Sequence, residues 1–135
     1  MIRFAFIYYL TVIYRVIRLF FHSKLTGDTN FLSTPVKTVH RILAQPSVGS
    51  YSTFIDIGCG EGLIGYFVRF FEKKTVIMHD IQNHFVIFIN LLKRLFFISK
   101  LTCSKEILRN YPMDSVFLCV WTSWSFDNRQ ARSEE

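Results

Sequence analysis

The chain has 135 residues, half of them hydrophobic, with 15 Phe and a formal net charge of +6. This length allows one domain. The charge is uneven: residues 1–50 hold six Lys and Arg against one Asp, whereas residues 51–135 hold ten against nine acids. This distribution argues against a nucleic-acid surface on the later part of the chain, and it favours a membrane as partner of the basic, apolar N-terminal segment.

Residues 1–24 are predicted to form an apolar helix. Polar side chains recur along it at steps of three or four, at Tyr8, Thr11, Arg15, Arg18 and His22. On a helix these residues form one narrow stripe, which suits a helix in the membrane interface with its arginines on anionic headgroups. A short signal anchor with snorkelling arginines and an ordinary helix packed on the domain also fit the pattern. The segment shows no small-residue cleavage site, so a removed signal peptide is not expected.

Residues 26–30 form a polar turn that should end this helix. A second helix is predicted to begin at Thr34 and Pro35, with Thr34 as its cap and Pro35 in its first position. Small residues from Pro46 to Thr53 then link it to the central stretch.

Residues 54–65, FIDIGCGEGLIG, read as a buried strand, a glycine-rich turn and the first turn of a helix. Gly58, Gly60 and Gly62 allow a sharp bend and leave room for a ligand against the main chain. A second strand follows at Thr75 to Asp80, and Asp80 lies eighteen residues after Gly62. This is the spacing of a strand–helix–strand unit whose terminal acid binds ribose hydroxyls, although an Asp there can also cap the next helix.

The rest of the chain continues the alternation of helix and strand. A crossover helix is predicted at residues 83–98, a third strand within residues 100–108 and a fourth, buried strand at residues 114–121. Three cysteines, Cys59, Cys103 and Cys119, show no C-x-x-C pair and no zinc spacing, so neither a metal site nor disulfides are expected, and a reducing, intracellular compartment is the default. Cys119 is expected to be a small core residue.

The run Asp56-Ile57-Gly58-Cys59-Gly60-Glu61-Gly62 resembles motif I of the class I S-adenosylmethionine (SAM) dependent methyltransferases. The resemblance implies an α/β fold, a Rossmann-like doubly wound parallel sheet preceded by the N-terminal helix. It implies that SAM is the cofactor and that the residues matching the motif hold its methionine and ribose end. The cofactor-binding residues so implied are Asp56, Gly58, Gly60, Gly62 and Asp80.

Features before and after motif I also bear on the resemblance. A polar turn and a Thr-Pro helix start ahead of motif I are similar to the membrane-anchored protein lysine methyltransferases, which makes Thr26, Asn30 and Thr34 candidate lid residues. The third strand lacks the acid that the family usually places beside adenine, with Glu106 the nearest. By resemblance Trp121 and Trp124 lie on the substrate side, and no catalytic residue is assigned.

The family carries three more strands than the four recognised here. We therefore expect a partial domain of about four strands: a helix at residues 1–25, a SAM-binding domain at 26–127 and a polar tail at 128–135. The expected function is methyl transfer from SAM, with a protein lysine as one acceptor. One alternative function is a non-catalytic SAM-fold module at a membrane. Another is an NAD-binding protein, because residues 60–65 also satisfy G-x-G-x-x-G. A dimer paired through the open sheet edge would cover that edge.

Overall fold

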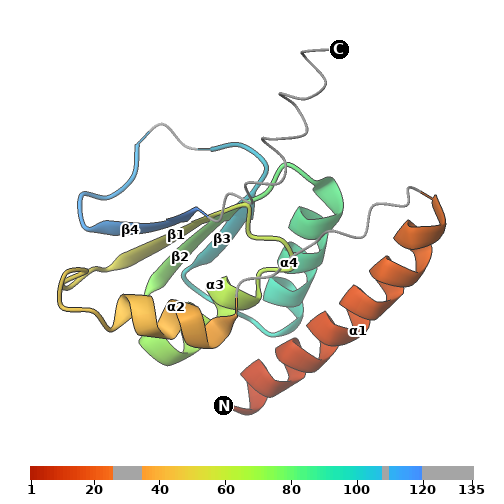
Figure 1. The fold of residues 1–135 in the computed structure, drawn as a ribbon, viewed down its shortest axis with the longest axis horizontal. Coiled ribbons are helices and arrows are strands. Elements are labelled where there is room, and N and C mark those ends of the chain that lie inside the picture. Colours follow the sequence, from red (N-terminus) through yellow and green to blue (C-terminus); the bar gives the residue numbers. More distant parts are fainter. Residues whose placement is uncertain (26–34, 108–109, 120–135) are drawn as a thin grey trace.

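The fold is a single parallel sheet with helices packed on it (Figure 1). A computed structural model describes residues 1–25, 35–107 and 110–119. The strands are β1 (Thr53–Ile57), β2 (Thr75–His79), β3 (Leu101–Ser104) and β4 (Ser115–Cys119), in the order β3-β2-β1-β4. This is the order of the first four strands of a doubly wound fold, so the predicted fold class is confirmed.

The central strand β1 pairs in parallel with β2 on one side and β4 on the other. Phe54, Ile55 and Asp56 are all buried, which explains why this strand lacks the alternation of apolar and exposed polar residues. Ile57 lies opposite His79 of β2, so β1 and β2 end side by side. The loop that leaves β1 and the residue that follows β2 therefore meet at the same edge of the sheet.

Two crossovers join the first three strands. The first contains α3 (Leu63–Phe67) and the continuing turn η1 (Val68–Glu72), and the second contains α4 (Asn83–Leu95). Figure 1 shows α3 and α4 over the same face of the sheet. Tyr66, Ile89 and Leu92 of these helices join Val76 and Met78 of β2 in the buried core. The hydroxyl of Tyr66 donates a hydrogen bond of 3.0 Å to the carbonyl of Ile89, which ties α3 to α4.

Helix α2 (Val36–Leu43) precedes β1 and packs on α3. It begins one residue later than predicted, because Pro35 is extended, with ψ of 134°, and serves as the N-cap. Thr34 lies outside the described residues. Helix α4 ends at Leu95, three residues before the predicted end, because Phe97 adopts a positive φ of 52° that a right-handed helix does not allow.

Helix α1 (Ile2–Leu25) lies against α3 and α4 as an outer layer (Figure 1). Its Phe4 meets Phe71 edge to face, with ring centroids 5.0 Å apart, and Tyr14 stacks on Phe88 of α4 at 4.0 Å. Ile7 and Thr11 are fully buried. Residues 2–21 form a helix long and apolar enough to cross a membrane by length and composition.

The orientation of α1 decides which face of this helix turns to the domain. Of the alternatives for the polar stripe, the structure shows a helix packed on the domain, because Thr11, Arg15 and Arg18 turn inward and not toward headgroups. The cause is a buried acid, Glu61, which attracts both arginines. Tyr8 at the edge of the stripe stays half exposed.

Candidate cofactor site

The glycine loop leaves β1 and turns over the end of β2. The N–H groups of Gly58 and Cys59 donate to the carbonyl oxygen of His79 at 2.8 and 3.1 Å. Gly58, Gly60 and Gly62 have φ values of 78°, 56° and 81°, in the left-handed region that favours glycine. Alternating glycines are therefore required here by the path of the chain itself.

The three glycines differ in what surrounds them. A Cβ added to Gly58 would meet nothing within 4 Å, whereas a Cβ on Gly62 would lie 2.8 Å from Cδ1 of Ile89. A Cβ on Gly65 would overlap the sulfur of Met78. Gly58 thus borders open space where a ligand can approach, while Gly62 and Gly65 let α3 pack closely on α4 and β2.

Two carboxyl groups converge beside this loop. Asp56 in β1 is 4% exposed and Asp80 after β2 is 9% exposed. Burial, and then the nearby charge of Asp80, raise the pKa of Asp56 to about 7. Two acids in one desolvated place disfavour a second negative charge, so the pair is suited to bind a cation.

Asp80 points at the glycine loop. Its Oδ2 accepts a hydrogen bond of 2.9 Å from the N–H of Gly60, and its Oδ1 accepts one of the same length from the N–H of Gln82. The second bond holds the N–H of Gln82, which is the N-cap of α4, so Asp80 lies two residues before the cap and does not itself cap the helix. A carboxylate has about four acceptor positions, which leaves capacity for ligand hydroxyls.

A third acid, Glu61, occupies the variable position between the last two glycines and is 2% exposed. Its Oε1 accepts from Nε of Arg15 at 3.0 Å and from Nη2 of Arg18 at 3.2 Å. The guanidinium of Arg18 also lies 5.0 Å from the centre of the Phe85 ring. We call Arg15, Arg18 and Glu61 the arginine clamp. Sequence reasoning missed it, although a charged residue inside an apolar glycine turn and two arginines on one helix stripe are visible signals.

His79 lies next to Asp80 and is buried. Its Nδ1 is 3.1 Å from Oγ of Ser104, and its Nε2 is 2.9 Å from the hydroxyl of Tyr111. Both ring nitrogens are therefore engaged, which indicates a structural role for this histidine. Sequence reasoning did not identify Tyr111, which approaches from the loop between β3 and β4.

The cysteine of the glycine loop is a partly buried thiol. The neighbouring Cys103 thiol of β3, together with burial, raises the pKa of Cys59 well above the usual range, and Sγ of Cys59 donates to the carbonyl of Gly60 at 3.8 Å. Cys59 and Cys103 are both free thiols. A thiol held neutral in this way is a poor nucleophile, so it fits a packing role. Within the described residues no group of three or more His, Cys, Asp or Glu side chains could hold a metal ion.

Several residues named from the sequence fall outside the described residues. These are the substrate-side candidates Trp121 and Trp124 and the lid candidates Thr26, Asn30 and Thr34. Glu106, the acid nearest to the end of β3, is exposed, and its carbonyl accepts a hydrogen bond from Ser104.

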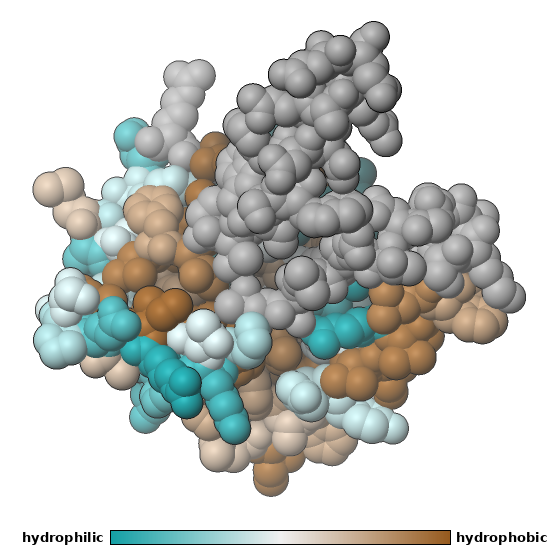
Figure 2. Space-filling model, in the orientation of Figure 1, coloured by the Kyte–Doolittle hydropathy of each residue, from teal (hydrophilic) through white to brown (hydrophobic). Residues whose placement is uncertain are grey.

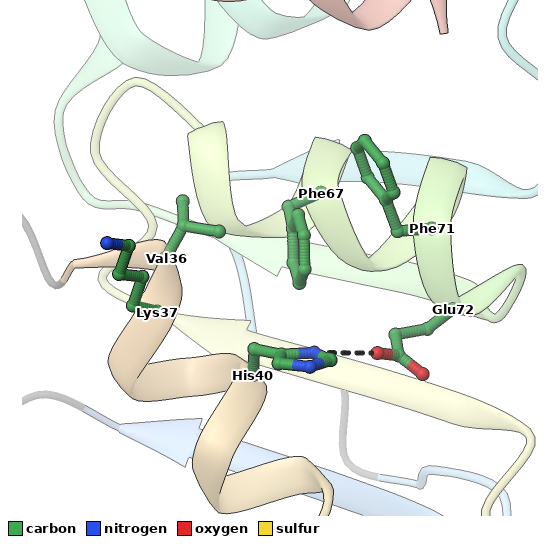
Figure 3. Close-up of a pocket in the computed structure, with 6 residues that line it drawn as sticks. All are labelled: Val36, Lys37, His40, Phe67, Phe71 and Glu72. Atoms are coloured by element: carbon green, nitrogen blue, oxygen red, sulfur yellow. Dashed lines mark ion pairs between the residues drawn. The ribbon is translucent and has the colours of Figure 1, made fainter.

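A pocket of about 380 Å³ lies elsewhere, between α2 and the α3–η1 turn (Figure 3). Phe67 and Phe71 line it, and Nδ1 of His40 faces Oε1 of Glu72 at 3.4 Å across it. None of its lining residues belongs to the glycine loop or to the acid pair. The pocket is therefore separate from the candidate cofactor site.

No family model matches the sequence, and no curated protein matches it. Solved structures that resemble the fold include coclaurine N-methyltransferase bound to N-methylheliamine and SAH, at 14% identity and a TM-score of 0.43 over 64% of this chain and 26% of that one. WbdD in complex with the kinase inhibitor LY294002 has 14% sequence identity and a TM-score of 0.46, over 65% of this chain and 21% of that one. A dimethyladenosine transferase from Plasmodium falciparum has 18% sequence identity and a TM-score of 0.47, over 77% of this chain and 38% of that one.

The chain thus spans well under half the length of these structures, and the similarity concerns the fold. The order of the strands and the position of the glycine loop after β1 are seen directly in the structure of this chain. The chain has a Rossmann-like fold, and its resemblance to the class I SAM-dependent methyltransferases, first given by the glycine motif, extends to the order of its four strands.

Proposed function

We propose that the chain binds SAM at the glycine loop and belongs to a protein that transfers its methyl group. The observation that carries this proposal is the convergence of Asp56 and Asp80, both nearly buried, on a loop with open space beside Gly58. Asp56 would face the amino group of the methionine part, and Asp80 would accept the ribose hydroxyls. Gly58 and Gly60 would let the ligand lie against the main chain, while Gly62 supports the loop through its packing.

The electrostatics favour SAM over NAD. SAM carries a sulfonium and an ammonium group, whereas the pyrophosphate of NAD is anionic and needs free N–H donors at the glycine turn. Here the N–H groups of Gly58, Cys59, Gly60 and Gly62 already donate within the protein. Two acids beside the loop would also repel a pyrophosphate. The NAD alternative therefore ranks second.

The reaction follows from the chemistry of this ligand. SAM supplies an electrophilic methyl group, and a protein catalyses its transfer mainly by positioning the acceptor and excluding water. The residues of this chain bind and orient the donor. A protein lysine is the acceptor class that the sequence resemblance suggests, and Trp121 and Trp124 are the candidates for its side of the site.

Calorimetry with SAM, S-adenosylhomocysteine and NADH tests the proposal. We expect the two adenosyl ligands to bind and NADH not to bind. Asp80→Ala should weaken SAM binding about 10- to 100-fold, the range for hydrogen bonds to a charged group. Asp114→Ala is the matched control, because Asp114 is an exposed acid just before the start of β4, at the opposite end of the parallel strands from the glycine loop. Equal affinity of the wild type and Asp80→Ala would refute the site.

A second role is favoured by α1. We infer that the chain associates with a membrane through residues 1–24, because α1 combines a spanning length with a largely exposed apolar surface. A chain that binds a membrane in this way but transfers no methyl group would be a non-catalytic SAM-fold module at that membrane. Flotation with vesicles, measured together with methyl transfer from radiolabelled SAM, separates an enzyme at a membrane from an interaction module. Pairing of two copies through the edge of β4 remains a further proposal, and light scattering tests it.

A further inference from the structure

We propose that α1 lies in the plane of a lipid bilayer while docked on the domain, with its outward face in the lipid and its inward arginines on Glu61. This inference rests on the membrane association proposed above, and it adds the orientation of the helix and the face that meets the lipid. It also assigns the arginine clamp a function, which is to hold the membrane helix against the cofactor loop.

The inward face of α1 is fully used by the domain. Ile7 and Thr11 are buried, and Tyr14 stacks on Phe88 with the two rings only 9° from parallel. The side chains of Arg15 and Arg18 are 30% and 13% exposed, and both bind Glu61. Contacts therefore run along the helix from its first turn to its fifth, so the docked helix cannot leave the side of the domain.

Crossing the bilayer would break this arrangement. The two arginines would enter hydrocarbon near the middle and end of the span, where charged side chains are expensive. Glu61 would lose the two guanidinium groups that neutralise it in a buried place. In the docked state both arginines pair with Glu61, which offsets one of their two charges, so a helix in the plane of the membrane keeps these ion pairs and holds the arginines out of the hydrocarbon.

The outward face of α1 is apolar and exposed. Large side chains on it have between 37% and 64% of their surface exposed, and they are Phe6, Tyr8, Tyr9, Val12, Ile13, Val16, Ile17, Leu19, Phe20 and Phe21. Figure 2 shows hydrophobic residues in brown over the place where Figure 1 draws α1. On the neighbouring α4, Ile87, Leu91 and Leu95 are each at least 60% exposed at a spacing of four. This spacing gives α4 its own apolar stripe beside α1.

Charge selects a bilayer as the occupant of this surface. Residues 2–25 contain the basic residues Arg3, Arg15, Arg18 and Lys24 and no Asp or Glu. Arg15 and Arg18 turn inward on Glu61, but four basic residues against this one acid still leave a net charge of +3 on the docked helix. Two copies of the chain would bring these like charges together, whereas anionic headgroups complement them. An amphipathic helix with an apolar outer face and basic residues toward its ends is suited to lie at the level of the headgroups.

Vesicle flotation of the full chain tests the surface. The wild type should float with vesicles of phosphatidylcholine and phosphatidylserine. The double variant Val16→Asp/Phe20→Asp should lose about 100-fold or more in partition, because two apolar side chains no longer enter the lipid. The control is Ile42→Asp, which adds an acid at a 41% exposed apolar position of α2. It should float as the wild type does, and all three proteins should melt at similar temperatures.

Tryptophan depth measurements test the orientation. Phe6→Trp, Ile13→Trp and Phe20→Trp are made singly in a chain carrying Trp121→Phe and Trp124→Phe, and bromine-labelled lipids report their depth. A helix in the plane puts all three at one shallow depth. A spanning helix separates positions 6 and 20 by about 21 Å along the bilayer normal, with position 13 deepest.

The outcomes are distinguishable. Equal, shallow quenching together with loss of flotation in the acidic double variant supports the proposal. Graded depths with retained flotation would leave the membrane association standing and overturn the orientation. A wild type that does not float overturns both, and a wild-type dimer that Val16→Asp/Phe20→Asp converts to a monomer would show that a second copy occupies the face.

Discussion

Replacing Glu61 by glutamine tests the arginine clamp most directly. The change keeps the shape of the side chain but removes the charge that binds Arg15 and Arg18 at 3.0 and 3.2 Å. Glu61 is 2% exposed and Arg18 13% exposed, so this pair is shielded from water, whereas Arg15 at 30% is partly screened. Removing one member of a buried ion pair costs about 3–5 kcal/mol, because the partner charge stays behind.

We expect the lower end of that range, about 3 kcal/mol, since the remaining guanidinium groups can reach solvent in part. For a domain of this size the loss corresponds to a melting temperature lower by about 10 °C. Arg18→Gln should approach this value, while Arg15→Gln should cost about 1 kcal/mol because exposed pairs contribute little. Glu72→Gln is the matched control, since Glu72 is 29% exposed and pairs only with His40 among the ion pairs of the described residues.

The assay is thermal and urea unfolding of the single variants and of the double variant Glu61→Gln/Arg18→Gln. A coupling energy of about 1–3 kcal/mol between the two positions is expected for groups in direct contact. Additive losses in the double variant, or equal melting temperatures for Glu61→Gln and Glu72→Gln, would show that the clamp does not hold α1 on the domain.

Three further predictions concern the core and the acid pair. Thr11→Val should stabilise the chain by about 1 kcal/mol in urea unfolding, because the buried Thr11 hydroxyl has no hydrogen-bond partner among the described residues and valine has the same shape; a destabilised variant would contradict this. Gly62→Ala should destabilise it by about 2 kcal/mol or more in the same assay, since a φ of 81° disfavours alanine and its Cβ would press on Ile89; Gly58→Ala, with open space around it, should lose less. Because burial and Asp80 raise the pKa of Asp56 to about 7, the folded chain keeps a proton that the unfolded chain releases near pH 4. The stability from this proton is complete below about pH 4 and is lost as the pH rises to about 7, so Asp56→Asn should flatten the stability profile in this window. If the free energy of unfolding of Asp56→Asn keeps the wild-type slope between pH 4 and 7, another group titrates in this range.

The pH dependence also connects to the proposed ligand. An ammonium group beside Asp56 would favour its charged form, so SAM binding should release a proton below pH 7 and tighten as the pH rises toward that value. Calorimetry in buffers of different ionisation enthalpy measures this release directly. Binding that does not change between pH 6 and 8 would exclude Asp56 from contact with the cation.

The sequence by itself determined the strands and the glycine turn, because these depend on neighbours in the chain. Phe54, Ile55 and Ile57, three apolar residues around Asp56, predict a buried strand before Gly58, and alternating glycines predict a bend with positive φ. The length of the strand–helix–strand unit likewise predicts the position of Asp80 at the end of the second strand, and in the structure it directly follows β2.

Only the tertiary structure decided which face of α1 turns inward. The periodicity of the helix shows a polar stripe, but a stripe of arginines suits headgroups and a buried acid equally well. The choice depends on Glu61, which is 46 positions after Arg15 in the sequence and becomes its neighbour when α1 packs on α3 and α4. Helical spacing fixes which residues share a face, whereas the partner of that face is set by long-range packing and by the cost of leaving a buried charge unpaired.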